Sequence, residues 1–130
     1  QLGLNPEAFT LLMSAGYIGG GNVPELFNHI SAAPFDGQIV YLTGHNHQLY
    51  EQAKQLASTH ANIHPLLYVP NIAPWLQASD VIVTKLGGLT TYEALACEVP
   101  VLADCMTPPM PQEAQTVDFL TQIGAARRVT

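Results

Sequence analysis

Residues Asp80–Asp104 combine features that suit a nucleotide-binding site. The apolar run Val81–Val83 leads into Gly87-Gly88, and the helical pattern that follows opens with Thr90 and carries Glu93. Glycines let the backbone approach a ligand closely, and the start of a helix presents unpaired N–H groups at its positive dipole end. A carboxylate one turn into the helix can accept hydrogen bonds from two sugar hydroxyls. This stretch predicts a pocket for a phosphate joined to a ribose.

A second glycine loop, Ser14–Asn22, joins the first predicted strand to the first predicted helix. Its spacing does not fit the dinucleotide pattern G-x-G-x-x-G, and it lacks the Lys-Ser/Thr of a P-loop. The loop still offers N–H groups beside a helix start, which suits a diphosphate. A tight turn without a ligand is the alternative. The candidate residues of this loop are Gly16, Tyr17, Ile18 and Gly19.

Four further candidate residues each have a structural alternative. Glu93, in Thr90-x-x-Glu93, also fits a helix capping box. Lys85 neutralises a phosphate or pairs with a nearby carboxylate. Gln112 and Glu113 follow a proline-rich loop and hold sugar hydroxyls, or they are ordinary first-turn residues of a helix.

Composition excludes several classes of function. A formal charge of −6 with only four Lys and Arg residues argues against binding nucleic acid or docking directly on an anionic membrane.

His45-x-His47 has no third ligand nearby, so we expect a solvated loop there and no metal site, and we expect no cofactor. Cys97 and Cys105 have no paired-motif spacing, which indicates thiols in a reducing compartment and a cytoplasmic protein.

Short apolar runs alternate with helical patterns over the whole chain. Continuous rather than alternating runs are typical of a parallel sheet covered on both faces, so we predict one Rossmann-like α/β domain of three layers over residues 1–130. The expected strands are Phe9–Met13, Ile39–Leu42, Leu66–Val69, Val81–Val83 and Pro100–Ala103. The expected helical stripes are Leu26/Phe27/Ile30, Leu49/Ala53/Leu56/Ala57, Ile72/Trp75/Leu76 and Ala114/Val117/Leu120/Ile123.

Capping signals mark several helix ends. Asn22 and Glu25 have capping-box spacing with Pro24 in the first turn, Asn46 is placed to cap the next helix, and Gly124 fits a helix terminator. Ligands of such sheets gather at the carboxyl ends of the strands, where the glycine clusters fall.

These residues resemble a known family. The string from Asp80 to Ala96 (DVIVTKLGGLTTYEALA), followed by Pro100 and by Pro111-Gln112-Glu113, is similar to the donor-binding half of two-domain (GT-B) glycosyltransferases. The most similar subgroup holds monogalactosyldiacylglycerol synthases, processive diacylglycerol glucosyltransferases and the peptidoglycan N-acetylglucosaminyltransferase. The resemblance extends to Ala15–Gly19 and to Gly44-His45-Asn46.

The resemblance implies roles for individual residues. Tyr68 and Val69 match the uracil contact, which is made largely through backbone groups, and Glu93 matches the carboxylate that holds the ribose. The diphosphate loops correspond to Gly16–Gly19 and to Gly87, Gly88, Leu89 and Thr90. Gln112 and Glu113 match the pair that contacts the transferred sugar.

The resemblance also implies an inverting, metal-independent transfer of a hexose from a UDP-sugar to a lipid acceptor such as diacylglycerol. The general base and the acceptor groove are then expected in an amino-terminal domain or subunit that this chain lacks. Membrane contact is expected only through that missing domain, and the chain is expected to bind nucleotide without turning over by itself. Two alternatives stay open: a UDP-N-acetylglucosamine 2-epimerase, and a non-catalytic donor-binding subunit of a split glycosyltransferase.

Overall fold

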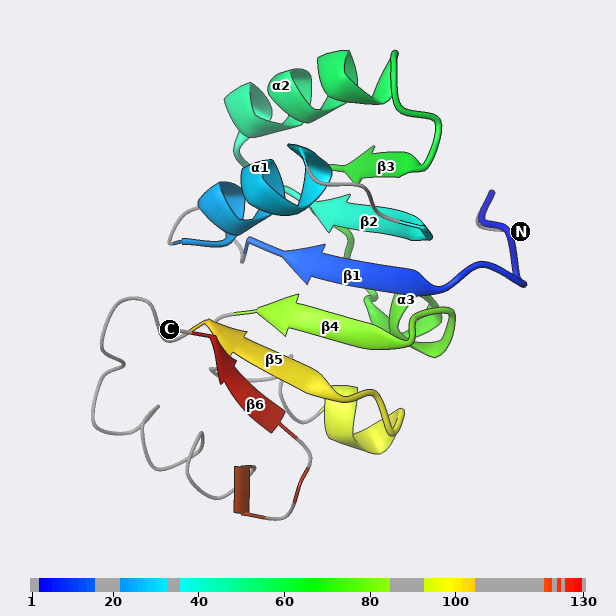
Figure 1. Ribbon diagram of the computed structural model, residues 1–130, viewed down its shortest axis with the longest axis vertical. Helices are drawn as coiled ribbons and strands as arrows, with labels where there is room; N and C mark the ends of the chain where they lie inside the picture. Colours follow the sequence, from blue (N-terminus) through cyan, green and yellow to red (C-terminus); the bar gives the residue numbers. More distant parts are fainter. Residues whose placement is uncertain are drawn as a thin grey trace.

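A computed structural model describes residues 3–15, 22–32, 36–84, 93–104, 121–122, 124 and 126–129. These residues form a six-stranded, fully parallel sheet in the order β3-β2-β1-β4-β5-β6 (Figure 1). The strands are β1 (Thr10–Ser14), β2 (Gln38–Leu42), β3 (Ile63–Leu66), β4 (Val81–Thr84), β5 (Val101–Asp104) and β6 (Ala126–Val129). The helices are α1 (Val23–Ala32), α2 (His47–Ala57) and α3 (Ala73–Gln77), and residues 93–96 are also helical.

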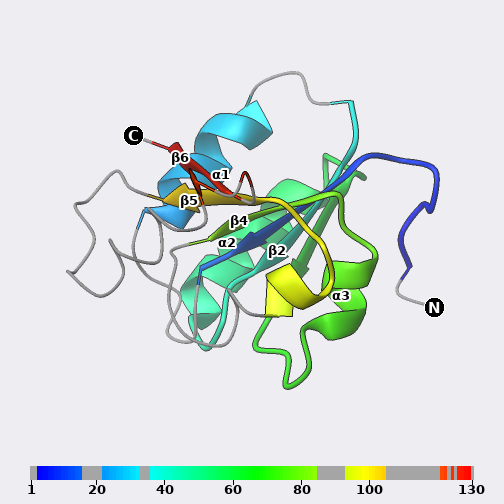
Figure 2. The same ribbon diagram turned by 90° about the horizontal axis from the view of Figure 1, so that it is seen from below.

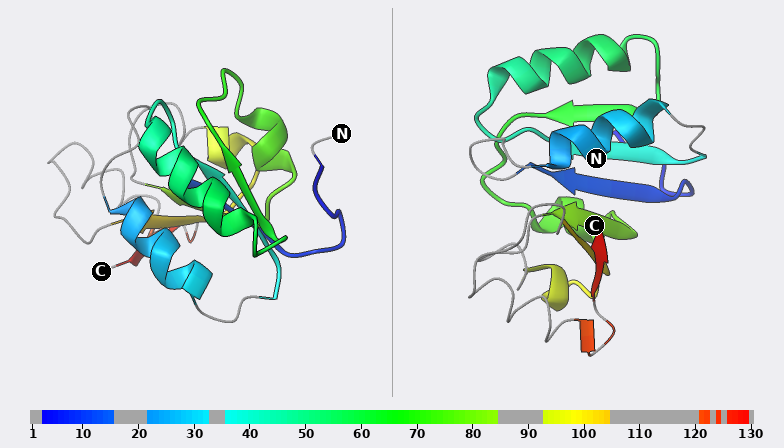
Figure 3. Two further views of the ribbon diagram at one scale, coloured as in Figure 1. Left: turned by 90° about the horizontal axis from the view of Figure 1, so that it is seen from above. Right: turned by 60° about the vertical axis from the view of Figure 1, so that its left-hand side comes forward.

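The sheet is covered on both faces, which confirms the predicted three-layer Rossmann-like class. On one face, Phe27 of α1 and Ala53 of α2 pack with Met13 and Ile39 of the sheet. On the other face, Leu76 of α3 and Ala94 pack with a second set of strand residues. Figure 2 shows α1 and α3 on opposite sides of the sheet, and Figure 3 shows α1 and α2 along the same side. Both faces of the central strands are buried because each has a helical layer to cover it.

The helix ends follow the local sequence. The side chain of Asn46 accepts a hydrogen bond from the backbone N–H of Leu49 at 3.0 Å, so the predicted cap of α2 is confirmed. Gly124 has a φ of 78° and its N–H donates to Thr121 O at 3.1 Å, as a helix terminator requires. Glu98 takes the same left-handed backbone after residues 93–96, with a φ of 58°, although it is not glycine. That conformation lets Val99 N donate to Ala94 O at 2.9 Å.

One strand prediction is wrong. We predicted a strand over Leu66–Val69, whereas β3 covers Ile63–Leu66. β2 ends at Leu42, whose Cα partner is Leu66, so the residues after Leu66 have no facing strand residue to extend the ladder. β3 is an edge strand, and it includes Pro65.

β6 is a strand that we did not predict. It pairs with β5 at the other edge of the sheet, and its residues Ala126-Arg127-Arg128-Val129 lack the apolar run on which the other strands were recognised. The predicted helical stripe Ala114/Val117/Leu120/Ile123 lies outside the described residues, which include only the helical residues 121–122 nearby.

Tyr41 is the one buried side chain in the described part of the chain whose polar atom has no hydrogen-bond partner there. Its ring stacks on Phe27 of α1, with centroids 4.1 Å apart and planes 15° from parallel. The hydroxyl is removed from water between the sheet and α1. Burial raises the pKa of Tyr41 to about 12, because the low-dielectric surroundings disfavour the phenolate.

Candidate functional site at the carboxyl end of the sheet

The order of the strands reverses at the middle of the sheet, between β1 and β4. Chain connections run from β1 outward through β2 to β3 on one side, and from β4 through β5 to β6 on the other. All six arrowheads in Figure 1 point to the same end of the sheet. In an open parallel sheet, ligands bind at the carboxyl ends of the strands where the order reverses, which here is the boundary between β1 and β4.

Both glycine loops begin at this boundary. Ser14 ends β1 and Thr84 ends β4, and the two are Cα partners in the ladder. Each is buried, with 8% and 4% of its surface exposed, so the polar ends of the two central strands are shielded from bulk water. The candidate residues of the two loops, Gly16, Tyr17, Ile18 and Gly19 after β1 and Lys85, Gly87, Gly88, Leu89 and Thr90 after β4, lie outside the described residues.

Glu93 is the first described residue after the second glycine loop. It is half-buried and begins the helical residues 93–96, and its carbonyl accepts a hydrogen bond from Cys97 N at 3.0 Å. No hydrogen bond or ion pair joins the Glu93 carboxylate to another of the described residues. The neighbouring Ala94 is fully buried, which fixes this segment against the sheet. The capping-box alternative depends on Thr90, which is not described.

Tyr68 and Val69 lie at the same end of the sheet, just beyond β3. Tyr68 is 46% exposed, whereas Val69 packs against the core cluster on the α3 face. The Tyr68 ring stacks on His45, which follows β2, with centroids 4.6 Å apart and planes 19° from parallel. We predicted a solvated loop around His45 and missed this pairing; its only signal was the Gly44-His45-Asn46 string in the family resemblance.

Gln112 and Glu113 lie outside the described residues. They follow β5, which is the neighbour of β4 on the side away from β1. The candidate residues therefore follow strands β3, β1, β4 and β5. Four interstrand spacings of about 4.8 Å separate β3 from β5, so the candidate site extends over about 19 Å.

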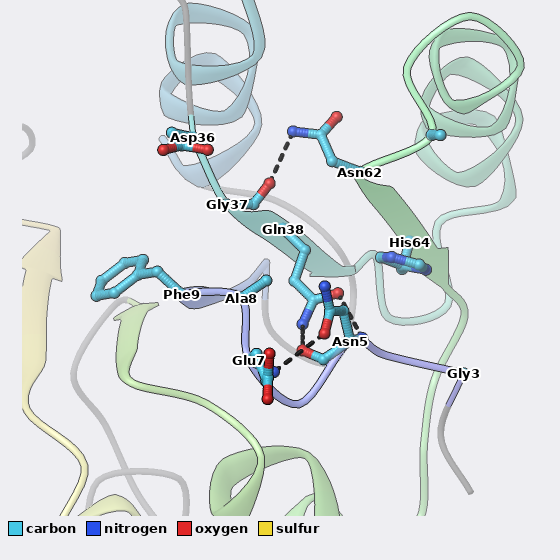
Figure 4. A pocket seen from close by; sticks show the side chains of 11 residues that line it. Gly3, Asn5, Glu7, Ala8, Phe9, Asp36, Gly37, Gln38, Asn62 and His64 are labelled. Carbon is cyan, nitrogen blue, oxygen red and sulfur yellow. Dashed lines mark hydrogen bonds between the residues drawn. The ribbon is translucent and has the colours of Figure 1, made fainter.

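A hollow of about 560 Å³ lies at the opposite, amino end of the sheet (Figure 4). Some of its lining residues are hydrogen-bonded to one another: Gln38 Nε2 donates to Asn5 O at 2.8 Å, and Asn62 Nδ2 donates to Gly37 O at 2.9 Å. We did not anticipate this hollow from the sequence. The Gln38 bonds hold the segment that leads into β1, and the Asn62 bond joins the starts of β2 and β3.

The described part of the chain meets the requirements of neither a three-ligand metal site nor a membrane-spanning helix. No group of three or more His, Cys, Asp or Glu side chains there is arranged to hold a metal ion. No helix within the same residues is long and apolar enough to cross a membrane.

Residues 22–103 match the family model of the glycosyltransferase family 28 C-terminal domain. The chain belongs to this family. The match includes β2 to β4, the first three residues of β5 and Glu93, and it leaves out Gly16–Gly19 of the first glycine loop and Gln112 and Glu113.

Curated relatives agree with this assignment. The chain is 35% identical over 129 residues to the processive diacylglycerol beta-glucosyltransferase of Bacillus pumilus, covering 97% of this chain and 33% of that protein. It is 30% identical over 125 residues to the enzyme of the same name from Staphylococcus carnosus, covering 95% of this chain and 32% of that protein. This family 28 domain thus spans about one third of the length of these relatives.

Solved structures of low sequence identity share the fold. The calicheamicin glycosyltransferase CalG4 superimposes with a TM-score of 0.74 at 19% identity, over 96% of this chain and 31% of that one. Anabaena Alr3699/HepE, solved in complex with UDP-glucose, superimposes with a TM-score of 0.56 at 14% identity, over 91% of this chain and 40% of that one. The recognised GT-B resemblance is confirmed at the level of fold and family.

Proposed function

We propose that this chain is the donor-binding half of an inverting glycosyltransferase that takes a UDP-sugar and transfers a hexose to a lipid such as diacylglycerol. The observation that carries the proposal is the pairing of Ser14 with Thr84, because it makes both glycine loops start at one point of the sheet. The family 28 match and the diacylglycerol glucosyltransferase relatives support a sugar donor and a lipid acceptor.

The proposed donor lies along the carboxyl end of the sheet. Uracil sits near Tyr68 and Val69 after β3, and the ribose hydroxyls contact Glu93. The diphosphate binds Gly16–Gly19 and Lys85–Thr90, and the sugar contacts Gln112 and Glu113 after β5. In the sheet, β1 and β4, which precede the diphosphate loops, lie between β3, which precedes the base contacts, and β5, which precedes the sugar contacts.

The chemical role of this domain in the proposal is to stabilise UDP as the leaving group. The acceptor hydroxyl attacks the anomeric carbon from the face opposite UDP, the bond to the diphosphate oxygen breaks, and its electron pair leaves with UDP. N–H groups of glycine loops beside a helix start can stabilise that charge without a metal ion. The base that takes the hydroxyl proton belongs, in this proposal, to an amino-terminal domain or subunit, which also makes any membrane contact.

Among the alternatives, the family 28 match favours a transferase over an epimerase. A donor-binding subunit of a split transferase would bind the same nucleotide. For both transferase arrangements we expect the isolated chain to bind UDP without transferring sugar. Sugar transfer by the isolated chain would contradict the placement of the base in another domain.

Calorimetric titration with UDP, with ADP and NAD as controls, tests the nucleotide assignment. We expect UDP alone to bind, and Glu93→Ala to weaken binding by about 1.5–3 kcal/mol, the range for hydrogen bonds to a charged group. Glu51→Ala, which removes an exposed carboxylate of α2, is the matched control and should leave UDP affinity unchanged. If Glu93→Ala lowers only the free energy of unfolding, Glu93 is a helix cap rather than a ribose ligand.

A further inference from the structure

The turn after β2 contacts the end of β3 and the segment that follows β3. The backbone N–H of Thr43 and its Oγ1 both donate to Leu66 O, at 2.8 and 2.9 Å. Two residues further on in each segment, the His45 ring stacks on the Tyr68 ring. A hydrogen-bonded anchor and a ring stack thus fix both the position and the direction of the chain that leaves β3.

The turn that provides these contacts, residues 43–46, is itself fixed. Thr43 is fully buried, and Gly44 has a φ of 64° that allows the chain to reverse there. Asn46 N donates to Thr43 O at 3.3 Å, and the Asn46 side chain caps α2. The contacts to Leu66 and Tyr68 therefore come from a turn that is held in place between β2 and α2.

Residues 67–69, which follow β3, continue past the last hydrogen-bonded pair of the sheet. The β2–β3 ladder ends at Leu66, so the peptide groups of residues 67–69 are not part of it. Val69 packs against the core, and Pro70 after it favours an extended backbone at Val69. The segment is short and is restrained at both ends.

A fixed peptide can distinguish pyrimidine bases. Uracil presents an N–H donor beside a carbonyl acceptor, whereas cytosine presents an acceptor and an amino donor at the same positions. A backbone C=O and N–H that pair with uracil would place acceptor against acceptor and donor against donor if cytosine were bound instead. The site then rejects cytosine because the polar groups of both partners stay unpaired. This discrimination requires that the peptide does not shift.

We infer that Thr43 and His45 are positioning residues that set the preference of the site for uracil over cytosine. They act by holding Leu66–Val69 and need not touch the base. The inference rests on the proposed function, since it assumes that the base lies near Tyr68 and Val69.

The test measures UDP and CDP affinities of the chain and its variants by calorimetry. We expect His45→Ala to weaken UDP binding by up to about 12-fold, because re-ordering the released segment on binding costs at most the stacking energy of an aromatic pair, and to weaken CDP binding less. The ratio of the two affinities should therefore fall. His45→Phe keeps a planar ring and should retain the ratio, and His47→Ala, an exposed histidine two residues away, should not change it.

A second pair of variants tests the anchor. Thr43→Val removes the hydroxyl donor to Leu66 O at nearly constant volume and should lower the UDP/CDP ratio, whereas Thr43→Ser retains the donor and should preserve it. If the wild-type chain binds UDP but neither His45→Ala nor Thr43→Val changes the ratio, the positioning role is overturned and the proposed function stands. If the wild-type chain binds UDP no better than ADP, both are overturned.

Discussion

Ser14 and Thr84 are Cα partners at the carboxyl ends of adjacent parallel strands, although 70 positions separate them in the sequence. This pairing places the starts of the two glycine loops one interstrand spacing apart, about 4.8 Å. Two segments that are weak signals separately therefore become parts of one candidate site. A diphosphate held there would meet Lys85 directly after Thr84 in the sequence.

Lys85→Ala should weaken UDP binding about 10- to 150-fold, the factor that corresponds to a hydrogen bond involving a charged group. Uridine affinity should not change, because uridine has no phosphate. Calorimetric titration of both ligands measures the difference. Lys54→Ala, which removes a cation placed over the Tyr50 ring of α2, is the control for lost charge. An equal loss for uridine and UDP would mean that Lys85 supports the fold instead.

Gln38→Ala should lower the free energy of unfolding by about 1–3 kcal/mol, because it leaves buried polar groups without partners. The Gln38 side chain is 4% exposed and accepts from Asn5 N at 3.1 Å while donating to Asn5 O and to Thr10 Oγ1, both at 2.8 Å. Urea denaturation measures the change. Gln48→Ala, an exposed position of α2, should stay within about 0.5 kcal/mol of wild type. A similar value for both variants would show that the Gln38 hydrogen bonds add nothing to stability.

The free energy of unfolding should fall as the pH rises from 10 to 12. The folded chain binds the Tyr41 proton more tightly than the unfolded chain does, because the pKa of Tyr41 is about 12 when folded and that of an ordinary tyrosine is 10.0. The stabilisation is present below pH 10 and is lost through pH 12, at up to about 1.4 kcal/mol per pH unit.

Urea denaturation at pH 9 and pH 11 measures this slope. Tyr41→Phe should make it shallower, and it should not destabilise the chain at neutral pH because the hydroxyl has no partner among the described residues. Gln48→Ala, at an exposed position of α2, removes no ionisable group and should keep the wild-type slope. An unchanged slope in Tyr41→Phe would show that this hydroxyl is not the group responsible.

Glu98→Gly should raise the free energy of unfolding by about 1 kcal/mol, since glycine adopts the left-handed backbone of this position without steric cost. Thermal unfolding measures the gain. Glu98→Ala keeps a Cβ at a φ of 58° and should show no comparable increase. An equal gain in both variants would assign the effect to the carboxylate rather than to the backbone.

Four of the five predicted strands were located to within one residue at each end, because continuous apolar runs mark strands buried on both faces. The prediction failed at the two edges. Leu66–Val69 is as apolar as a strand, but its facing strand stops at Leu42, and β6 is a strand in spite of Arg127 and Arg128. Strand ends at an edge depend on the neighbouring strand, which local sequence does not record.

Some features of the candidate site could be predicted from the sequence, and others could not. Glycine loops and Glu93 are visible in the sequence because they form motifs, and the family match includes Glu93. The adjacency of Ser14 and Thr84 comes only from strand order, and the contact of His45 with Tyr68 comes from two turns that meet in space. Contacts of this kind could not be predicted, because each partner is an ordinary residue in its own segment.

Pro65 has a consequence for the behaviour of this chain at high concentration. Ile39 N donates to Asn62 O, and Thr43 N donates to Leu66 O. The backbone N and O atoms of residues 62, 64 and 66 therefore point toward β2. The backbone N and O atoms of Pro65 point away from β2, toward the open edge. Proline has no N–H to offer there, and an incoming strand from another molecule would lose a hydrogen bond at the centre of the exposed edge. At its β3 edge the sheet thus carries built-in protection against strand-to-strand aggregation.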